Sequence, residues 1–253
     1  MLSRSKTQKV SWLAFCFTLF LALSCQAKPT LSLSTIKKTT VSEICFQILH
    51  RAYQKLGYKL EMLPLPSKQA LDISNTGISD GEICRIAPLP QVYPNLIMVP
   101  VAIFQLQVHA YTLDKDIKFS HFSELQGYRI GGLGGVVLLE REFANMDFYT
   151  TRSIKSTFDE LLEGKFDIAI AAKLSGLYHL AEQDRHHIQR HDPPLLIEPL
   201  YHYLHKNHQH LVPAITSRLK AMNQGGEIQK IRQAYEQALL IYQAQQDHAS
   251  SSR

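Results

Sequence analysis

Short strand-like segments alternate with helix-like segments along most of this chain, and this alternation limits the folds open to it. Residues 29–36 alternate apolar and hydroxyl side chains, which is the two-residue period of a β-strand. Residues 40–56 instead place apolar side chains on one helical stripe. The strand-and-helix order restarts after Ser120. Two such rounds predict an α/β protein with two lobes and mixed, mainly parallel sheets.

Capping and proline signals set the expected limits of several elements. Thr40 and Glu43 fit a capping box at the start of the first helix, and Gly57 suits a left-handed residue after its end. Pro64 is expected to end a second strand that starts at residue 58, and Pro100 to interrupt a long β-rich stretch over residues 95–113. A third strand is expected over residues 81–87, and the chain from residue 211 is expected to be helical.

The first 27 residues have the order of a secretory signal peptide. A basic start is followed by an apolar run over residues 10–23 and then by small residues, which predicts cleavage after Ala27. A membrane anchor is the alternative, but a spanning helix needs about 20 apolar residues. Cys25 also leaves a lipoprotein form open. We therefore expect a periplasmic protein.

Removal of this segment changes the charge of the chain. The whole sequence has 27 Lys and Arg against 22 Asp and Glu. Three of the basic residues lie in the signal, so 24 remain against 22, a net charge of +2. No dense basic face remains, and neither a nucleic acid nor an anionic lipid is indicated as a partner.

Two cysteines, Cys45 and Cys84, remain in the exported chain. Disulfides persist in oxidising compartments, and this pair would close a loop worth about 4 kcal/mol in the chain-entropy model. Two buried free thiols are the alternative.

A cluster of glycines, "GGLGG" at residues 131–135, follows a strand and precedes a helix. The third glycine of a dinucleotide fingerprint is missing, because Val137 stands in its place. A phosphate loop would need Lys followed by Ser or Thr, and Val136 and Val137 stand there instead. What remains is a turn that presents backbone N–H groups to the space between the lobes, or a turn needed only for chain reversal.

Metal and catalytic motifs are weak. Four histidines lie between His202 and His210, and on a helix some of them would share a face, but no acidic or cysteine ligands complete a zinc set. We expect these histidines to be solvated and no metal or cofactor to be bound. No nucleophile motif is present, so an enzyme would need an acid or base such as Asp80 or Glu82.

Arg85 lies inside an apolar segment, residues 82–89, just after an expected turn at residues 79–82. A guanidinium at the end of a strand can hold a carboxylate or phosphate through two parallel hydrogen bonds. An internal salt bridge with Glu82 is the alternative.

The mature chain resembles the bacterial extracellular solute-binding proteins of the polar amino acid ABC transporter type, from about residue 41 to 240. The similarity depends on the order and spacing of several segments: "AYQKLGYKLEMLPLP", "SDGEICRI", "YPNLIMVPVAI", "FSELQGYRIGGLGG", "TFDELLEGKFDIAIAA" and "LYHYLHKNHQHLVPAITSRLKAMNQGGEIQKI".

The resemblance implies two α/β lobes that close over a ligand by a hinge motion. The first lobe would hold residues 28–107 and 203–253, and the second residues 108–202. Residues 106–112 and 197–203 would be the two crossing strands. It also implies the ligand contacts, with Arg85 holding a carboxylate beside Glu82 and backbone N–H groups coming from Gly134, Gly135 and Val136.

Two departures from the family pattern bear on the ligand. The loop lacks the usual Ser or Thr, and Ala171, Ala172 and Lys173 stand where an Asp usually holds an α-ammonium group. With Arg85 and Lys173 facing the cleft, an anionic or carboxylate-bearing solute fits better than a free amino acid. We expect a monomeric binding protein that serves an inner-membrane permease or sensor. An enzyme on the same scaffold, or an envelope protein with a degenerate cleft, remains as an alternative.

Overall fold

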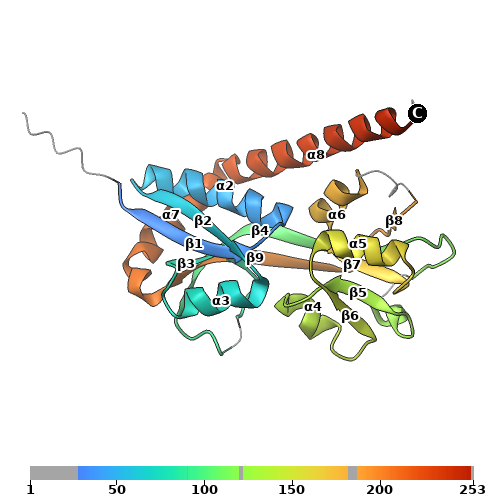
Figure 1. Ribbon diagram of the computed structural model, residues 1–253. Coiled ribbons are helices and arrows are strands. Elements are labelled where there is room, and N and C mark those ends of the chain that lie inside the picture. The colour runs from blue at the N-terminus through green and yellow to red at the C-terminus, as the bar shows by residue number, and fades with distance from the viewer. Residues whose placement is uncertain (1–27, 90, 120–121, 182–186, 252–253) are drawn as a thin grey trace, which may run out of the picture.

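The computed structural model describes residues 28–89, 91–119, 122–181 and 187–251. The predicted signal peptide, with Cys25, lies outside the described residues. Two α/β lobes sit side by side and share one nine-stranded sheet (Figure 1). The strand order along the sheet is β2-β1-β3-β9-β4-β7-β5-β6, and β8 pairs with β4.

The first lobe is built on a parallel sheet covered by helices. Its strands are β1 (Thr30–Ile36), β2 (Lys59–Leu65) and β3 (Gly81–Arg85), with β1 parallel to both neighbours. Helix α2 (Thr40–Lys55) packs on β2 and β3, while α3 (Ser67–Asn75) packs on β1. Helix α7 (Val212–Gln224) contacts α2 and β4.

Helix α2 shows how the local sequence sets these elements. Its N-cap is Thr39, whose Oγ1 accepts a hydrogen bond from the Ser42 N–H at 3.2 Å, so the cap lies one residue before the predicted one. Gly57 has a φ of +86°, as predicted for the residue that ends the helix. The predicted apolar stripe is buried except for Leu56 at its end, which is only partly buried. Cys45 and Tyr53 are buried beside these stripe residues: Val41, Ile44, Ile48, Leu49 and Ala52.

The second lobe repeats the arrangement. Strand β5 (Ile130–Leu133) lies parallel to β6 (Phe148–Thr151) and to β7 (Ile168–Ala172). A short 3-10 helix (Phe122–Leu125) precedes β5. The helices of this lobe are α4 (Val137–Glu142), α5 (Ile154–Leu162) and α6 (Lys173–Leu180). Helix α5 begins at a capping box in which Ser153 and Ser156 exchange hydrogen bonds.

Two long antiparallel strands join the lobes. Strand β4 (Leu96–Thr112) pairs with β9 (Leu196–His205) from Leu96 opposite His205 to Val108 opposite Leu196. The predicted crossings, 106–112 and 197–203, are parts of these strands. Strand β4 also pairs with β7 and with β8 (Gln189–Arg190), so hydrogen bonds continue across both lobes.

Two proline predictions were wrong. Strand β2 continues through Pro64 to Leu65, because β2 is an edge strand and one side of it needs no N–H donors. Strand β4 continues through Pro100, where the pairing with β9 shifts register between Met98 and Ala102.

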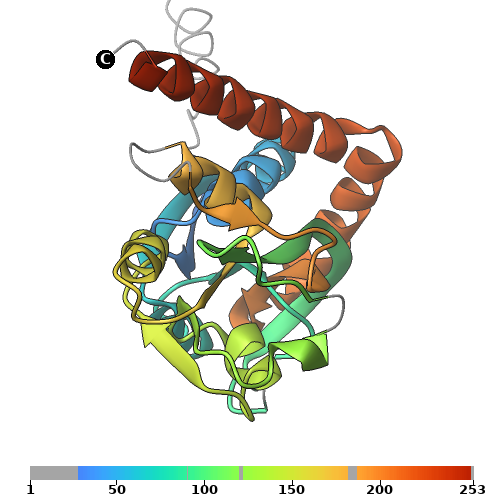
Figure 2. The same cartoon turned by 90° about the vertical axis from the view of Figure 1, so that its right-hand side faces the viewer.

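Helix α8 (Glu227–Ser251) leaves the first lobe and runs over the second (Figures 1 and 2). It packs on α2 and α7 in the first lobe and on α6 in the second. Its first two turns bury Ile228 and Ile231 in the main core. A 3-10 segment (Lys206–Leu211) joins β9 to α7.

Candidate functional site

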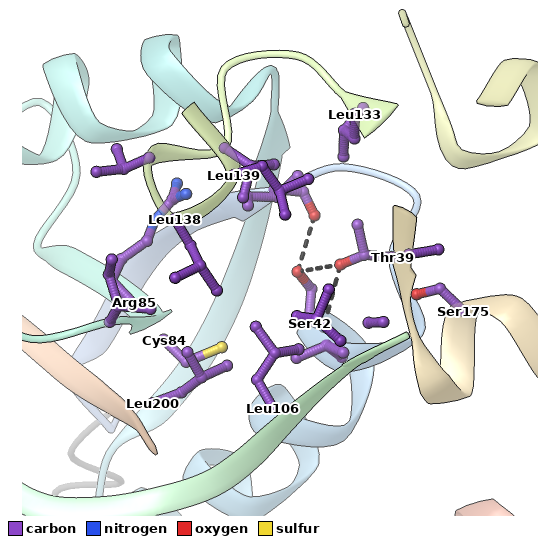
Figure 3. Close-up of a pocket in the computed structure, with 18 of the residues that line it drawn as sticks. Thr39, Ser42, Cys84, Arg85, Leu106, Leu133, Leu138, Leu139, Ser175 and Leu200 are labelled. Atoms are coloured by element: carbon purple, nitrogen blue, oxygen red, sulfur yellow. Dashed lines mark hydrogen bonds between the residues drawn. The ribbon is translucent and has the colours of Figure 1, made fainter. Parts of the chain in front are cut away.

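A cavity of about 110 Å³ lies between the two lobes (Figure 3). It sits where the carboxyl ends of β1, β3, β5 and β7 meet the starts of α2, α4 and α6. Ligands of open α/β sheets usually bind in such a crevice. Apolar side chains from both lobes form most of its wall, including Ile36, Val41, Ile86, Leu89, Leu106, Val108, Leu133, Val136, Val137, Leu138, Leu139, Ile154, Ile170 and Leu200.

A few polar groups interrupt this wall. At one end lie the hydroxyls of Thr39, Ser42 and Ser175, and at the other lie Arg85 and Cys84 (Figure 3). Thr39 Oγ1 donates to Ser42 Oγ at 2.7 Å, and Ser42 Oγ donates to the carbonyl of Ile36 at 2.9 Å. None of these hydroxyl residues was predicted to contact a ligand. For Thr39 and Ser42 the only signal was the start of a helix after β1, and Ser175, in α6, had none.

Arg85 is almost fully buried, with 6% of its surface exposed, and is bound to Glu82. Its Nε and Nη2 each lie 3.1 Å from a different carboxylate oxygen of Glu82, so the two groups form a bidentate ion pair. Nη1 donates to Ser67 Oγ at 3.0 Å and Nη2 also donates to the Ser67 carbonyl at 3.2 Å. Ser34 Oγ donates to Glu82 at 3.1 Å.

The alternative of an internal salt bridge is therefore the arrangement observed for Arg85. The pair is neutral as a unit, and most guanidinium N–H groups already have acceptors within the first lobe. Arg85 nevertheless lines the cavity, whereas Glu82 lies behind it with no surface exposed. A role of either residue in ligand binding stays a prediction.

The glycine loop lies at one side of the cavity. It contributes a side chain to the wall, while the N–H groups of its last two glycines are bonded elsewhere. The Gly134 N–H donates to the Thr151 carbonyl at 3.0 Å, and the Gly135 N–H donates to Glu140 Oε1 at 2.9 Å. Only Val136 of the three predicted contacts lines the cavity. Gly135 has a φ of +75°, and a Cβ built on it would lie 3.5 Å from Ser67 Cβ. The loop thus approaches the first lobe beside Arg85.

Lys173 does not lie in the interlobe cavity. It begins α6, and its ammonium group pairs with Glu236 of α8. It lines a separate cavity of about 70 Å³ together with Arg232, which lies 5.1 Å from the ring centre of Phe104. The structure therefore brings Arg85 and Val136 to one cavity and leaves Lys173 outside it.

The two acids considered for catalysis have structural partners. Asp80 accepts a hydrogen bond from the Ser32 N–H at 2.7 Å, and its other oxygen lies 2.7 Å from His208 Nε2. Neither Asp80 nor Glu82 lines the interlobe cavity. Among the described residues, no Asp or Glu side chain lines this cavity.

Cys45 and Cys84 are both buried free thiols in the structure. Burial raises the pKa of the Cys45 thiol, and its hydrogen-bonding contact with Cys84 raises it further. The disulfide stays a prediction, which the mass of the mature chain under non-reducing conditions tests.

The expectation of solvated histidines was wrong for His202 and His205, which lie in β9 and not on a helix. His202 is fully buried; its Nδ1 lies 2.6 Å from the Glu82 carbonyl and its Nε2 lies 2.8 Å from the Tyr53 hydroxyl. Burial lowers the pKa of His202 to about 4. Within the described residues, no three or more His, Cys, Asp or Glu side chains could hold a metal ion.

Comparisons with known proteins agree with this architecture. The histidine kinase sensor domain with similarity to periplasmic binding proteins has a TM-score of 0.70 at 12% identity, covering 83% of this chain and 96% of that one. The ligand-binding core of GluR0, solved with L-glutamate, also reaches 0.70 at 11% identity, with coverages of 81% and 97%. An amino acid ABC transporter substrate-binding protein from Streptococcus pneumoniae, bound to L-arginine, reaches 0.68 at 12% identity, with 84% and 96%.

At these identities the similarity shows the fold: the chain has the two-lobed architecture of periplasmic binding proteins. No family model matches it. An uncharacterized protein of Shewanella oneidensis is 28% identical over 194 residues, covering 74% of this chain and 73% of that protein. In the described part of the chain, no helix combines the length and the apolar character needed to cross a bilayer.

Proposed function

We propose that this protein binds a small, largely apolar solute between its lobes and holds it by hinge closure. The observation that supports this best is the apolar cavity, because both lobes supply its wall and four strand ends converge on it. The similar solved structures include solute-binding proteins and a sensor domain, which supports a binding role over an enzymatic one.

We place the division of the lobes at the two long strands. Residues 28–107 and 203–253 would form the first lobe and residues 108–202 the second, with a hinge where residues 106–108 of β4 pair with 196–198 of β9. Closure would bring Val136 and the glycine loop against Arg85 and Ser67.

A carboxylate-bearing or anionic solute is a second candidate, favoured by the presence of Arg85 in the cavity wall. Four further residues predicted to contact the ligand do not line the cavity, so they would act on such a solute only indirectly: Glu82, Gly134, Gly135 and Lys173. A carboxylate beside Arg85 would have to share the guanidinium with Glu82, so two buried anions would face one cation. The geometry therefore favours a neutral group at that end.

The signal-like N-terminus supports export to the periplasm, where the protein would act as a monomer. Its partner there would be an inner-membrane permease of the ABC type or a membrane sensor. The similar structures include a substrate-binding protein of an amino acid ABC transporter and a sensor domain of a histidine kinase. Uptake and sensing have the same binding step and differ only in the partner.

The test is a binding measurement on the mature chain and on a variant with a filled cavity. Val136 lines the cavity and is half-buried, so Val136→Trp should fill the space without unfolding the protein. We expect isothermal titration with 1-hexanol to show binding that Val136→Trp abolishes. Val92→Trp, at a residue that is 69% exposed, is the matched control. Absence of binding to 1-hexanol, with or without binding of amino acids, would overturn the proposed ligand chemistry.

A further inference from the structure

A second, larger hollow of about 580 Å³ adjoins the interlobe cavity. Thr39, Ile154 and Ser175 line both spaces, so they form the boundary between them. The hollow is a groove whose wall is still mainly apolar but carries more polar surface than the wall of the cavity. It runs between the starts of α2 and α5 and is flanked by α6 and α8, with the wall Lys38, Thr39, Thr40, Glu43, Ser153, Ile154, Lys155, Ser175, Tyr178, His179, Tyr235 and Leu239.

The hydroxyl of Ser175 marks this boundary as a binding position. Ser175 is 3% exposed, and its Oγ, which has no hydrogen bond to a residue that the structure describes, stays open to the adjoining space. Figure 3 shows this hydroxyl turned toward Thr39. A buried hydroxyl normally has a hydrogen-bond partner. A polar group of a ligand at the boundary would supply one.

Two helix N-termini meet at the same place. Thr39 caps α2 and Ser153 caps α5, and each cap bonds only the third N–H of its helix. The first N–H groups of a helix have no helical acceptor, and the N-terminal end carries a partial positive charge. Helices of 16 and 9 residues here direct that charge toward one groove.

The charged side chains of the groove favour an anion at its inner end. Lys38 and Lys155 supply two cations, of which Lys155 also pairs with Asp159 at 2.8 Å. Glu43 supplies the opposing carboxylate. His179 also faces the groove and has a partner of its own. Both lysines are exposed, so an anion held here keeps part of its hydration.

We propose that the ligand is an amphiphilic carboxylate whose apolar body fills the interlobe cavity and whose carboxylate lies at the Thr39–Ser175 boundary. This inference depends on the proposed function, because it assigns the head group of the same ligand. It places the charge away from Arg85, whose guanidinium is already neutralised by Glu82. The carboxylate accepts hydrogen bonds from Ser175 and from the first N–H groups of α2 and α5.

The experiment compares hexanoate, 1-hexanol and acetate by isothermal titration against the mature chain. Hexanoate supplies body and head, 1-hexanol lacks the charge, and acetate lacks the body. We expect hexanoate to bind about tenfold more tightly than 1-hexanol, since two helix N-termini and two lysines contribute. Acetate should not bind measurably.

Two variants locate the head group. Lys38→Gln with Lys155→Gln should weaken hexanoate binding about three- to tenfold and leave 1-hexanol binding unchanged. Ser175→Ala should lower the same preference. The matched control is Lys115→Gln with Lys118→Gln, two exposed lysines outside the groove, which should change neither affinity.

The outcomes separate the two proposals. If neither 1-hexanol nor hexanoate binds, both the proposed ligand chemistry and this inference are wrong. If 1-hexanol binds as tightly as hexanoate or more tightly, the apolar site stands and the head-group assignment fails. If hexanoate is preferred but neither groove variant reduces the preference, the carboxylate binds elsewhere and the inference is also overturned.

Discussion

Arg85 and Glu82 form an ion pair inside the first lobe, and each charge compensates the cost of burying the other. The two side chains have 7% and 0% of their surface exposed. A buried pair gains little over an apolar pair of the same shape, because desolvation offsets the attraction. Removal of one partner is different, since the remaining charge stays buried without compensation.

We therefore expect Glu82→Ala to destabilise the protein by about 3–5 kcal/mol. The double variant Glu82→Leu with Arg85→Met should be closer to wild type than Glu82→Ala, because no lone charge remains. Urea unfolding of the two variants and of wild type gives the free energies. A double variant as unstable as Glu82→Ala would show that the pair contributes beyond mutual neutralisation.

His202 should make stability depend on pH. Nδ1–H donates to the Glu82 carbonyl and Nε2 accepts from the Tyr53 hydroxyl, so the neutral ring satisfies both contacts. Burial lowers the pKa of this group to about 4, below the usual 6.5 of an unfolded chain. The stabilisation is complete above pH 6.5 and is lost as the pH falls toward 4, because only the unfolded chain then gains a proton.

We expect up to about 3 kcal/mol of stability to be lost through His202 between pH 7 and pH 4. Unfolding of wild type and His202→Gln at several pH values measures the difference. The slope of stability against pH should be shallower in His202→Gln, while His210→Gln, at an exposed residue, should keep the wild-type slope. Equal slopes in wild type and His202→Gln would contradict the assignment.

At the scale of elements, α6 packs closely on β4 because Gly176 has no side chain. A Cβ added there would overlap the Tyr111 hydroxyl. This hydroxyl is buried and has no hydrogen-bond partner among the described residues. A buried unpaired hydroxyl is costly, so Tyr111→Phe should be neutral or stabilising.

We expect Gly176→Ala to destabilise the protein by about 1–3 kcal/mol through overpacking. Combined with Tyr111→Phe, the same change should cost less, because the overlapping atom is absent. A double-mutant cycle from thermal or urea unfolding measures the coupling. Strict additivity of the two changes would mean that the helix shifts away from β4 and avoids the overlap.

Much of the element order could be predicted from the sequence, because local patterns specify it. The stripe of α2 and the alternation of β1 depend on neighbouring residues and were recognisable without tertiary information. Pro64 and Pro100 were misjudged because their effect depends on which strands lie beside them. His202 was misjudged because only its tertiary partners, Tyr53 and Glu82, explain its burial.

The site was less predictable for the same reason. Arg85 was selected from its place in an apolar segment at the end of a strand, and it does line the cavity. Its ion pair with Glu82 and its contacts with Ser67 need the folded arrangement of β3 and α3. The apolar wall has no sequence signature, because Leu106, Val136 and Leu138 look like ordinary core residues until two lobes meet around them.

At the scale of the whole molecule, α8 bridges the lobes on the side opposite α3 and α4, where the glycine loop approaches the start of α3 (Figure 1). Glu236 pairs with Lys173 of α6, and Tyr242 stacks on Tyr178 with ring centres 5.9 Å apart and planes at 11°. The start of the same helix is fixed in the first lobe by Ile228 and Ile231. Hinge opening would have to break the contacts with α6 or carry α8 along.

We expect the double variant Glu236→Gln with Tyr242→Ala to open more readily than wild type, because the ion pair and the ring stacking between α8 and α6 are lost while the buried start of α8 is kept. Without ligand, X-ray scattering should give a larger radius of gyration for the variant. Binding of the apolar probe should weaken, since the closed arrangement would then be a smaller fraction of the free protein. Glu227→Gln, which removes an ion pair with Arg218 within the first lobe, is the control and should leave the radius unchanged. If the Glu236 and Tyr242 variant keeps the wild-type radius both with and without ligand, α8 does not restrain the hinge.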